Sequence, residues 1–158
     1  MQSAPADVRS PPNPNAMTLY PYDPPLLHTL PRSEVTRHWD YAIPKDETTS
    51  GLTRQRLRQV QEYIDAHLDS ALPTSELAAC AGLSVSHFSR SFARAVGMTP
   101  HDYVLKRRVL RAQQLLMESE LSMVEIAMST GFSDQSHFSR RFRERLGLPP
   151  KAFRVRHR

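Results

Sequence analysis

Two short stretches of the chain repeat one arrangement of polar and aromatic residues. They are HFSRSF at residues 87–92 and HFSRRF at residues 137–142, and they differ at one position in six. Arginine presents a planar fork of N–H donors, serine both donates and accepts, and histidine offers two ring nitrogens. Such side chains suit the binding of phosphates and of the hydrogen-bonding edges of nucleic-acid bases.

The rest of the sequence offers little for catalysis or metal binding. His87 and His137 have no partner ligands at short helical spacing, which argues against a metal site. The sequence contains no clustered nucleophile–base pair, no paired carboxylates in a pocket-forming motif and no glycine-rich phosphate loop. We therefore expect neither an enzyme nor a cofactor. The single cysteine, Cys80, lies in the apolar stretch LAACAG, and we expect a small buried core residue there.

Charge and proline are unevenly distributed along the chain. The 158 residues carry a formal net charge of +5. Residues 1–50 have a net charge of −2 and nine of the thirteen prolines, whereas residues 51–158 have a net charge of +7. A basic segment suggests an acidic partner, most often nucleic acid. The apolar runs are too short for a membrane span, no secretory signal is present, and the lone cysteine fits the cytoplasm.

These differences divide the chain at about residue 50. Residues 1–50 predict a proline-rich and mostly disordered segment, although EVTRHWDYAI could form a short strand or a docked extended stretch. The pattern of residues 51–158 is helical throughout, which predicts an all-α domain of seven helices. In the first helix, expected at residues 54–68, Leu57, Val60 and Ile64 lie on one face.

Capping signals predict where the later helices begin. The expected N-caps are Thr74, Ser84, Thr99, Ser122 in the capping box SMVE, and Ser133. The helix after Thr99 starts with Pro100, a residue favoured at the first helical position, and is expected to run to about Met117. A seventh, short helix is expected in GLPPKAF.

Residues 76–100 and 125–150 are two copies of one unit, each with the pattern helix, glycine-containing turn, helix. Gly82 and Gly131 stand where the turn requires positive φ. This pattern predicts helix-turn-helix units at about residues 74–96 and 122–146. In such a unit the second helix enters the major groove of DNA.

The phenylalanines, spaced four residues apart, predict which face of each second helix is buried, so the polar residues between them face outward. Outward residues suited to reading base edges are Ser86, Ser89, Arg90, Gln135, Ser136, Ser139 and Arg140. Residues expected to contact the DNA backbone are His87, Arg94, Arg107, Arg111, His137, Arg141, Arg143 and Lys151. For the two histidines and for Arg107 and Arg111, a solvated surface position stays open as an alternative. Arg141 replaces Ser91 of the first copy, so we expect the second copy to bind the backbone more strongly.

The distance between the copies suits binding by one chain. The connecting helix, residues 100–117, spans roughly 27 Å at about 1.5 Å per residue. Recognition helices in successive major grooves on one face of B-DNA lie about 34 Å apart. The spacing therefore favours two major-groove contacts by a single monomer.

A resemblance to a known family rests on three stretches. They are LAACAGLSVSHFSRSFARAVGMTPHDYV, RRVLRAQQLL and IAMSTGFSDQSHFSRRFRERLGLPPKAFR. Over about residues 52–156 the chain resembles the DNA-binding domain of the AraC/XylS family of bacterial transcription regulators. The resemblance implies seven helices, two helix-turn-helix units joined by a long helix, and base contacts at the positions named above.

The resemblance also implies a cellular role. It implies a cytoplasmic, nucleoid-associated regulator that binds double-stranded promoter DNA, contacts RNA polymerase and activates transcription more often than it represses. Only about fifty residues precede the match, too few for the effector-binding domain of most members. This favours a small stand-alone member that binds as a monomer, with a shortened gene model or a remnant of a longer protein as alternatives.

Two other classes of function stay open. A non-specific architectural or protein-interaction module could use the same helices, and it would coat DNA uniformly instead of protecting discrete sites. An enzyme with an attached DNA-binding domain would need a catalytic constellation that the sequence lacks.

Overall fold

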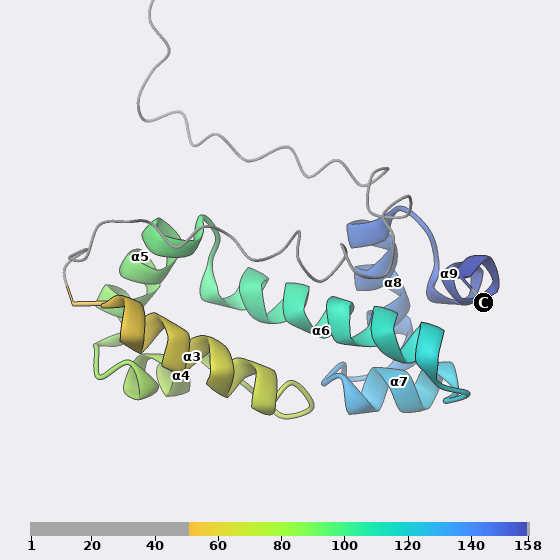
Figure 1. Cartoon of the computed structure of the whole chain (residues 1–158), viewed down its shortest axis with the longest axis horizontal. Coiled ribbons are helices and arrows are strands. Elements are labelled where there is room, and N and C mark those ends of the chain that lie inside the picture. Colours follow the sequence, from red (N-terminus) through yellow and green to blue (C-terminus); the bar gives the residue numbers. More distant parts are fainter. Residues whose placement is uncertain (1–50, 158) are drawn as a thin grey trace, which may run out of the picture.

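The computed structural model describes residues 51–157, and within that range it contains seven α-helices and no strand. The helices are α3 (Arg54–Ala66), α4 (Thr74–Cys80), α5 (Val85–Val96), α6 (Pro100–Glu118), α7 (Met123–Ser129), α8 (Gln135–Leu146) and α9 (Pro150–His157). Figure 1 shows α6 running between two groups, with α3, α4 and α5 at one end and α7, α8 and α9 at the other. The predicted all-α fold is confirmed. The predicted N-terminal segment, residues 1–50, lies outside the described residues.

The first group, with the start of α6, forms one hydrophobic core. The face of α3 predicted to be apolar is buried, with Val60 and Ile64 fully inaccessible to solvent. Phe88 and Phe92 of α5 are also fully buried, and the ring of Phe92 meets Tyr103 of α6 edge-on at 5.4 Å. Tyr103 therefore anchors the beginning of α6 in the first unit.

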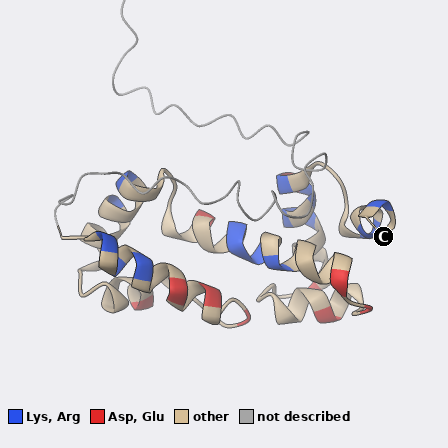
Figure 2. Ribbon diagram, viewed as in Figure 1, with Lys and Arg blue, Asp and Glu red and all other residues tan. Residues whose placement is uncertain are grey.

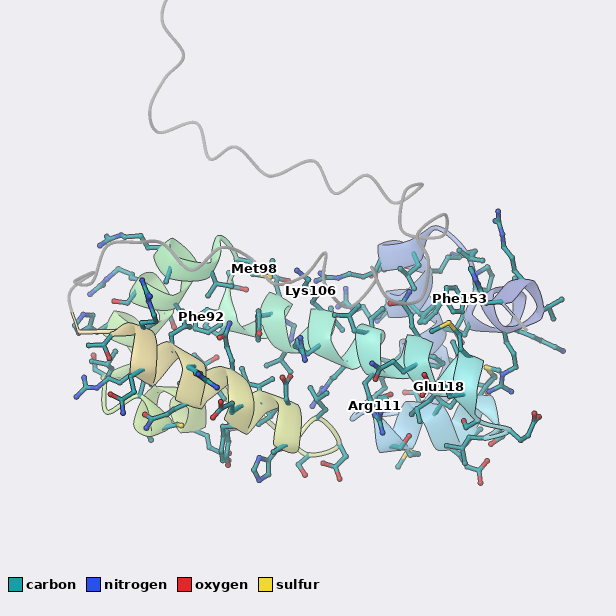
Figure 3. All side chains as sticks on the ribbon, viewed as in Figure 1. Phe92, Met98, Lys106, Arg111, Glu118 and Phe153 are labelled. Carbon is teal, nitrogen blue, oxygen red and sulfur yellow. The ribbon has the colours of Figure 1, made fainter. Side chains whose placement is uncertain are left out.

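The second group forms a separate core around the later turns of α6. That helix contributes Val109, Ala112 and Leu116, all buried. Phe142 of α8 contacts Phe138 at 5.5 Å and Phe153 of α9 at 5.4 Å between ring centres. In Figure 3 Phe92 and Phe153 lie on opposite sides of the molecule, with Lys106 on α6 between them. The two cores share α6 but no residue.

Three of the predicted N-caps are confirmed. The hydroxyl of Ser84 accepts the N–H of His87 at 3.4 Å, and that of Thr99 accepts the N–H of Asp102 at 3.2 Å. Ser122 and Glu125 form the predicted capping box, because each side chain accepts the other residue's backbone N–H. These caps position the starts of α5, α6 and α7.

Two predicted N-caps are wrong, each by one residue. Pro73 caps α4, and its carbonyl accepts the N–H groups of Glu76 and Leu77, so Thr74 is already the first helical residue. The proline's extended conformation, with ψ of 146°, ends the preceding loop at this point. Asp134 rather than Ser133 caps α8, because its carboxylate accepts the N–H of His137 at 2.7 Å. A charged acceptor forms the stronger hydrogen bond at a helix N-terminus.

The prediction that Cys80 is buried is also wrong. Leu77, Ala78 and Ala81 of the first helix-turn-helix unit pack into the core, whereas Cys80 is exposed. At about 100° per residue, Cys80 points roughly 110° away from the mean direction of Leu77, Ala78 and Ala81, outside the narrow face that this short helix buries.

Candidate nucleic-acid interface

Helix α5 carries the first set of predicted base-reading residues on its solvent side. Because Phe88, Phe92 and the half-buried Val96 turn inward, Ser86 and Arg90 are exposed and Ser89 is half-buried. Ser84 caps the helix two residues before Ser86, so these polar side chains occupy its N-terminal half. This is the half of a recognition helix that meets base edges in helix-turn-helix proteins.

Helix α8 repeats the arrangement. Gln135, Ser136 and Arg140 are exposed and Ser139 is half-buried, while Phe138, Phe142 and Leu146 face the core. The structure therefore places all seven predicted base-reading residues on the outer sides of α5 and α8. Whether these residues contact bases stays a prediction.

The corrected cap of α8 brings the two recognition helices into register. Asp134 stands three residues before His137, as Ser84 stands three residues before His87. The second copy has two residues between Gly131 and its cap, where the first has one between Gly82 and Ser84, so the extra residue of the second copy lies in the turn. Ser86, Ser89 and Arg90 correspond to Ser136, Ser139 and Arg140, position by position. The hydrogen bond from the His137 N–H, with a further one from the Ser133 hydroxyl, lowers the pKa of Asp134.

This register reveals a candidate DNA-contacting residue that the sequence did not predict. Val85, the first residue of α5, corresponds to Gln135, and 46% of it is exposed despite its apolar side chain. An exposed apolar residue at this position is suited to contact with the C5-methyl group of thymine.

The predicted backbone contacts fall into two groups. Arg94, Arg143, Lys151 and Arg111 are exposed, and His87 and His137 are half-buried. The His137 ring lies 3.2 Å from the Ser133 hydroxyl and meets Phe132 edge-on at 5.5 Å. His87 and Arg94 lie on α5 and His137 and Arg143 on α8, the helices that carry the base-reading positions. Lys151 lies on α9, and Arg111 lies on α6 and hydrogen-bonds Gln114 at 3.2 Å.

Two predicted backbone contacts already bind acidic partners within the protein. Arg107 forms a two-point ion pair with Asp65 of α3, at 2.7 and 2.8 Å. Arg141 pairs with Glu144 at 3.0 Å and lines a crevice of about 570 Å³ together with Arg108 and His101. Ser91, the counterpart of Arg141, is buried. Position 141 therefore points partly away from the face that Arg140 occupies, and its phosphate contact stays a prediction.

Charge is distributed unequally over the molecule. Figure 2 shows basic residues on α5, α6, α8, α9 and the first turns of α3, with acidic ones on the later turns of α3, on α4 and α7, and near both ends of α6. In the described part of the chain no group of three or more His, Cys, Asp or Glu residues is placed to hold a metal ion. None of the helices within residues 51–157 is long and apolar enough to cross a membrane.

Two helix-turn-helix units, joined by a long helix and exposing matched polar faces on their second helices, define a double helix-turn-helix DNA-binding domain. Comparison with known families agrees, because residues 77–156 match the model of a helix-turn-helix domain. The chain belongs to the AraC/XylS family of transcription regulators.

Solved structures and curated proteins give the same result. A transcriptional regulator with an AraC-type DNA-binding domain from Chromobacterium violaceum is 30% identical, with a TM-score of 0.63 over 66% of this chain and 93% of that one. The DNA-binding domain of AdpA, determined with a target DNA, is 34% identical, with a TM-score of 0.61 over 63% of this chain and 90% of that one. The probable transcriptional regulator LumQ of Photobacterium leiognathi is 37% identical over 94 residues, which are 60% of this chain and 38% of LumQ.

The curated relatives are longer than the region they share with this chain. The chain spans less than half the length of the regulators it matches. Relatives from Bacillus subtilis and Yersinia enterocolitica are named transcriptional activators.

Proposed function

We propose that this protein binds specific sequences in promoter DNA by inserting α5 and α8 into two successive major grooves. The observation that carries the proposal is the matched register of the two helices. Each presents serine, serine and arginine at corresponding positions on its outer side, above a pair of buried phenylalanines. Helix α6 has 19 residues and is therefore about 28 Å long, a length compatible with grooves one turn apart.

Each residue of the interface has a proposed role. Arg90 and Arg140 donate two hydrogen bonds to guanine, Gln135 pairs with adenine, and the four serines, Ser86, Ser89, Ser136 and Ser139, donate or accept at either base. The exposed Arg94, Arg143 and Lys151, together with His87 and His137, contact phosphates and fix the register on the duplex. Arg111 contacts phosphate from α6. Arg141 does so when it exchanges Glu144 for phosphate, whereas Arg107 keeps its two-point pair with Asp65.

We further propose that the protein activates transcription and binds its site as a monomer. Two recognition helices in one chain supply the two groove contacts that many helix-turn-helix proteins obtain by dimerisation. Activation, through contact with RNA polymerase, is what the resemblance implies, and two of the curated relatives carry that name. Transcription in vitro from a bound promoter, with and without the protein, tests the sign of regulation.

The central experiment combines site selection with one substitution. Sites are selected from random duplexes, and the affinity of Arg140→Ala is then measured on the selected site and on random DNA. The loss on the selected site should be about 1–3 kcal/mol, with relaxed choice at one base pair. Arg58→Ala is the control, because Arg58 is exposed on α3 and, among residues 51–157, its ion-pair partner is Glu62 on the same helix surface.

Two outcomes would count against the proposal. An equal loss on selected and random DNA would assign Arg140 to the phosphates instead of the bases. If no sequence is enriched in the selection, the protein is a non-specific architectural module, and uniform coating in a footprint would support that alternative.

A further inference from the structure

The two groups of helices, α3–α5 (the first unit) and α7–α9 (the second unit), touch each other directly beside α6. The loop after α3 comes close to the turn of the second helix-turn-helix unit. Arg108 of α6 donates from Nε to the carbonyl of Leu68 at 3.1 Å and from Nη2 to the carbonyl of Ser70 at 2.6 Å. Gly131 lies against the carbonyl of Leu68 and the guanidinium of Arg108. One arginine thus holds a loop of the first unit against the turn of the second.

The closeness of this contact is visible at Gly131. A Cβ added there would overlap the Leu68 carbonyl oxygen and lie 2.7 Å from Arg108 Nη2. Gly82 occupies the corresponding position in the first unit and has a similar φ, 64° against 74°. A Cβ at Gly82 would meet no atom closer than 4.0 Å. The backbone conformation therefore explains both glycines, whereas only Gly131 is also required by a neighbouring unit.

Little else in the described residues fixes one unit against the other. The two cores are separate, and the helix pairs that pack extensively either belong to one unit or include α6. Arg145 of α8 approaches Asp102 near the start of α6, at 3.5 Å from its carbonyl and 3.6 Å from its carboxylate. Arg108 makes shorter contacts than Arg145, at 3.1 and 2.6 Å, and both side chains are half-buried.

We propose that Arg108, Gly131 and the carbonyls of Leu68 and Ser70 form a joint that sets the angle between the two units, and through it the spacing of the two DNA half-sites. The second part rests on the proposed function. One added base pair shifts a half-site along the duplex and rotates it about the axis, so only a fixed angle between α5 and α8 discriminates between spacings. Arg108 and Gly131 are positioning residues, because they act on DNA only through the recognition helices.

The joint can be tested without DNA by measuring a distance between the units. Cys80 is exposed on α4 and is the only cysteine of the chain, and Ser129 is the corresponding exposed residue of α7. Spin labels on Cys80 and on the cysteine introduced by Ser129→Cys report the distance between the units by double electron–electron resonance. The variants are Arg108→Ala, Arg108→Lys and Gly131→Ala, with Gly82→Ala as the matched control for the cost of a side chain at positive φ.

The distance distribution should be narrow in the doubly labelled protein that carries no further substitution, and equally narrow in the doubly labelled Gly82→Ala variant. We expect it to broaden in Arg108→Ala and to shift or broaden in Gly131→Ala, with partial recovery in Arg108→Lys. Circular dichroism checks that each variant is folded. If Gly131→Ala does not fold, Arg108→Ala decides. A folded Arg108→Ala with an unchanged distribution would overturn the joint.

A second measurement addresses the DNA spacing. The affinity of the unlabelled proteins is measured on the selected site and on derivatives with one base pair inserted or removed between the half-sites. The unchanged protein should lose roughly tenfold or more on the altered spacings, and Arg108→Ala should lose distinctly less relative to its own best site. Base preference within each half-site should not change.

The two measurements separate the inference from the proposed function. If no specific site exists, the proposed function and the spacing role fail together, and the spin-label distances still decide whether the joint holds the units. If a specific site exists and Arg108→Ala discriminates spacings as well as the unchanged protein does, the joint does not set the spacing and the proposed function stands.

Discussion

Arg107 of α6 holds Asp65 of α3 through two hydrogen bonds, from Nε to Oδ1 at 2.7 Å and from Nη2 to Oδ2 at 2.8 Å. Both side chains are about one-third exposed. Burial raises the pKa of Asp65, and it outweighs the charge and the hydrogen bonds of Arg107, which lower it. The pair therefore fixes how α3 packs on α6 more than it contributes to the free energy of unfolding.

This ion pair competes with the phosphate contact that the sequence predicts for Arg107. We expect Arg107→Ala to lower the free energy of unfolding by about 0–1 kcal/mol and to leave the salt dependence of DNA binding nearly unchanged. Lys151→Ala, at an exposed position, should reduce the slope of log K against log salt by about one. Titrations at several salt concentrations measure both slopes. A reduction by about one for Arg107→Ala would show that Arg107 leaves Asp65 for a phosphate.

The sequence predicts the helices and their buried faces well, for a physical reason. A period of about 3.6 residues, as in Leu57, Val60 and Ile64, requires no knowledge of the partner helix. The two phenylalanines of each repeat likewise determine which side of α5 and α8 faces outward. Helix starts are harder to predict where two capping residues are adjacent. Ser133 and Asp134 are both good caps, and only the structure shows which one meets the His137 N–H.

The partners of the arginines on α6 could not be predicted from the sequence. Arg107 binds a residue 42 positions away, and Arg108 binds carbonyls 40 and 38 positions away. Such pairs depend on how α3 and its following loop pack on α6, and no local pattern encodes that packing. The same reason explains why a solvated surface position stayed open as the alternative for Arg107.

Asp134 should make the stability of the second unit depend on acid pH. Its pKa is lowered in the folded protein, so its contribution is present above the usual value of 3.8 and is lost as the pH falls through the folded value. Thermal unfolding from pH 3 to pH 7 should show a loss for Asp134→Ala at neutral pH. Ser133→Ala should lose less, because Ser133 does not cap the helix.

Asp134→Asn is the matched control for that experiment. Asparagine caps a helix about as well as aspartate but does not titrate, so the variant should keep the cap and lose the acid dependence. Equal effects of Asp134→Ala and Ser133→Ala at neutral pH would contradict the assignment of Asp134 as the cap.

Because of Lys106, the free energy of unfolding should increase with pH in mild alkali. Burial, with the neighbouring charges of Arg145 and Arg107, lowers its pKa from 10.5 to about 8. Between these two values the unfolded chain holds more protons at this position than the folded one, so the free energy of unfolding increases with pH. Urea denaturation between pH 7 and 9.5 should show the rise. It should be absent in Lys106→Met and retained in Lys151→Met, and equal slopes in all three proteins would contradict the prediction.

Val85 provides a prediction about one methyl group of the DNA. It is exposed at the first position of α5, in register with Gln135 of α8. If it packs on a thymine methyl, Val85→Ser should weaken binding by about 1 kcal/mol, the value of roughly one buried methyl group. Replacing that thymine by deoxyuridine should weaken the unchanged protein by a similar amount and leave Val85→Ser unaffected.

Gln135→Ala is the control for Val85, because it changes the corresponding position of the other recognition helix. This variant should keep its sensitivity to deoxyuridine in the half-site read by α5 and lose discrimination in the half-site read by α8. The two substitutions lie in separate units, so their effects on affinity should add in the double variant. The loss of affinity on deoxyuridine substitution can be compared between Val85→Ser and the unchanged protein at each thymine of the half-site. If the two losses are equal at every thymine, Val85 contacts no methyl group.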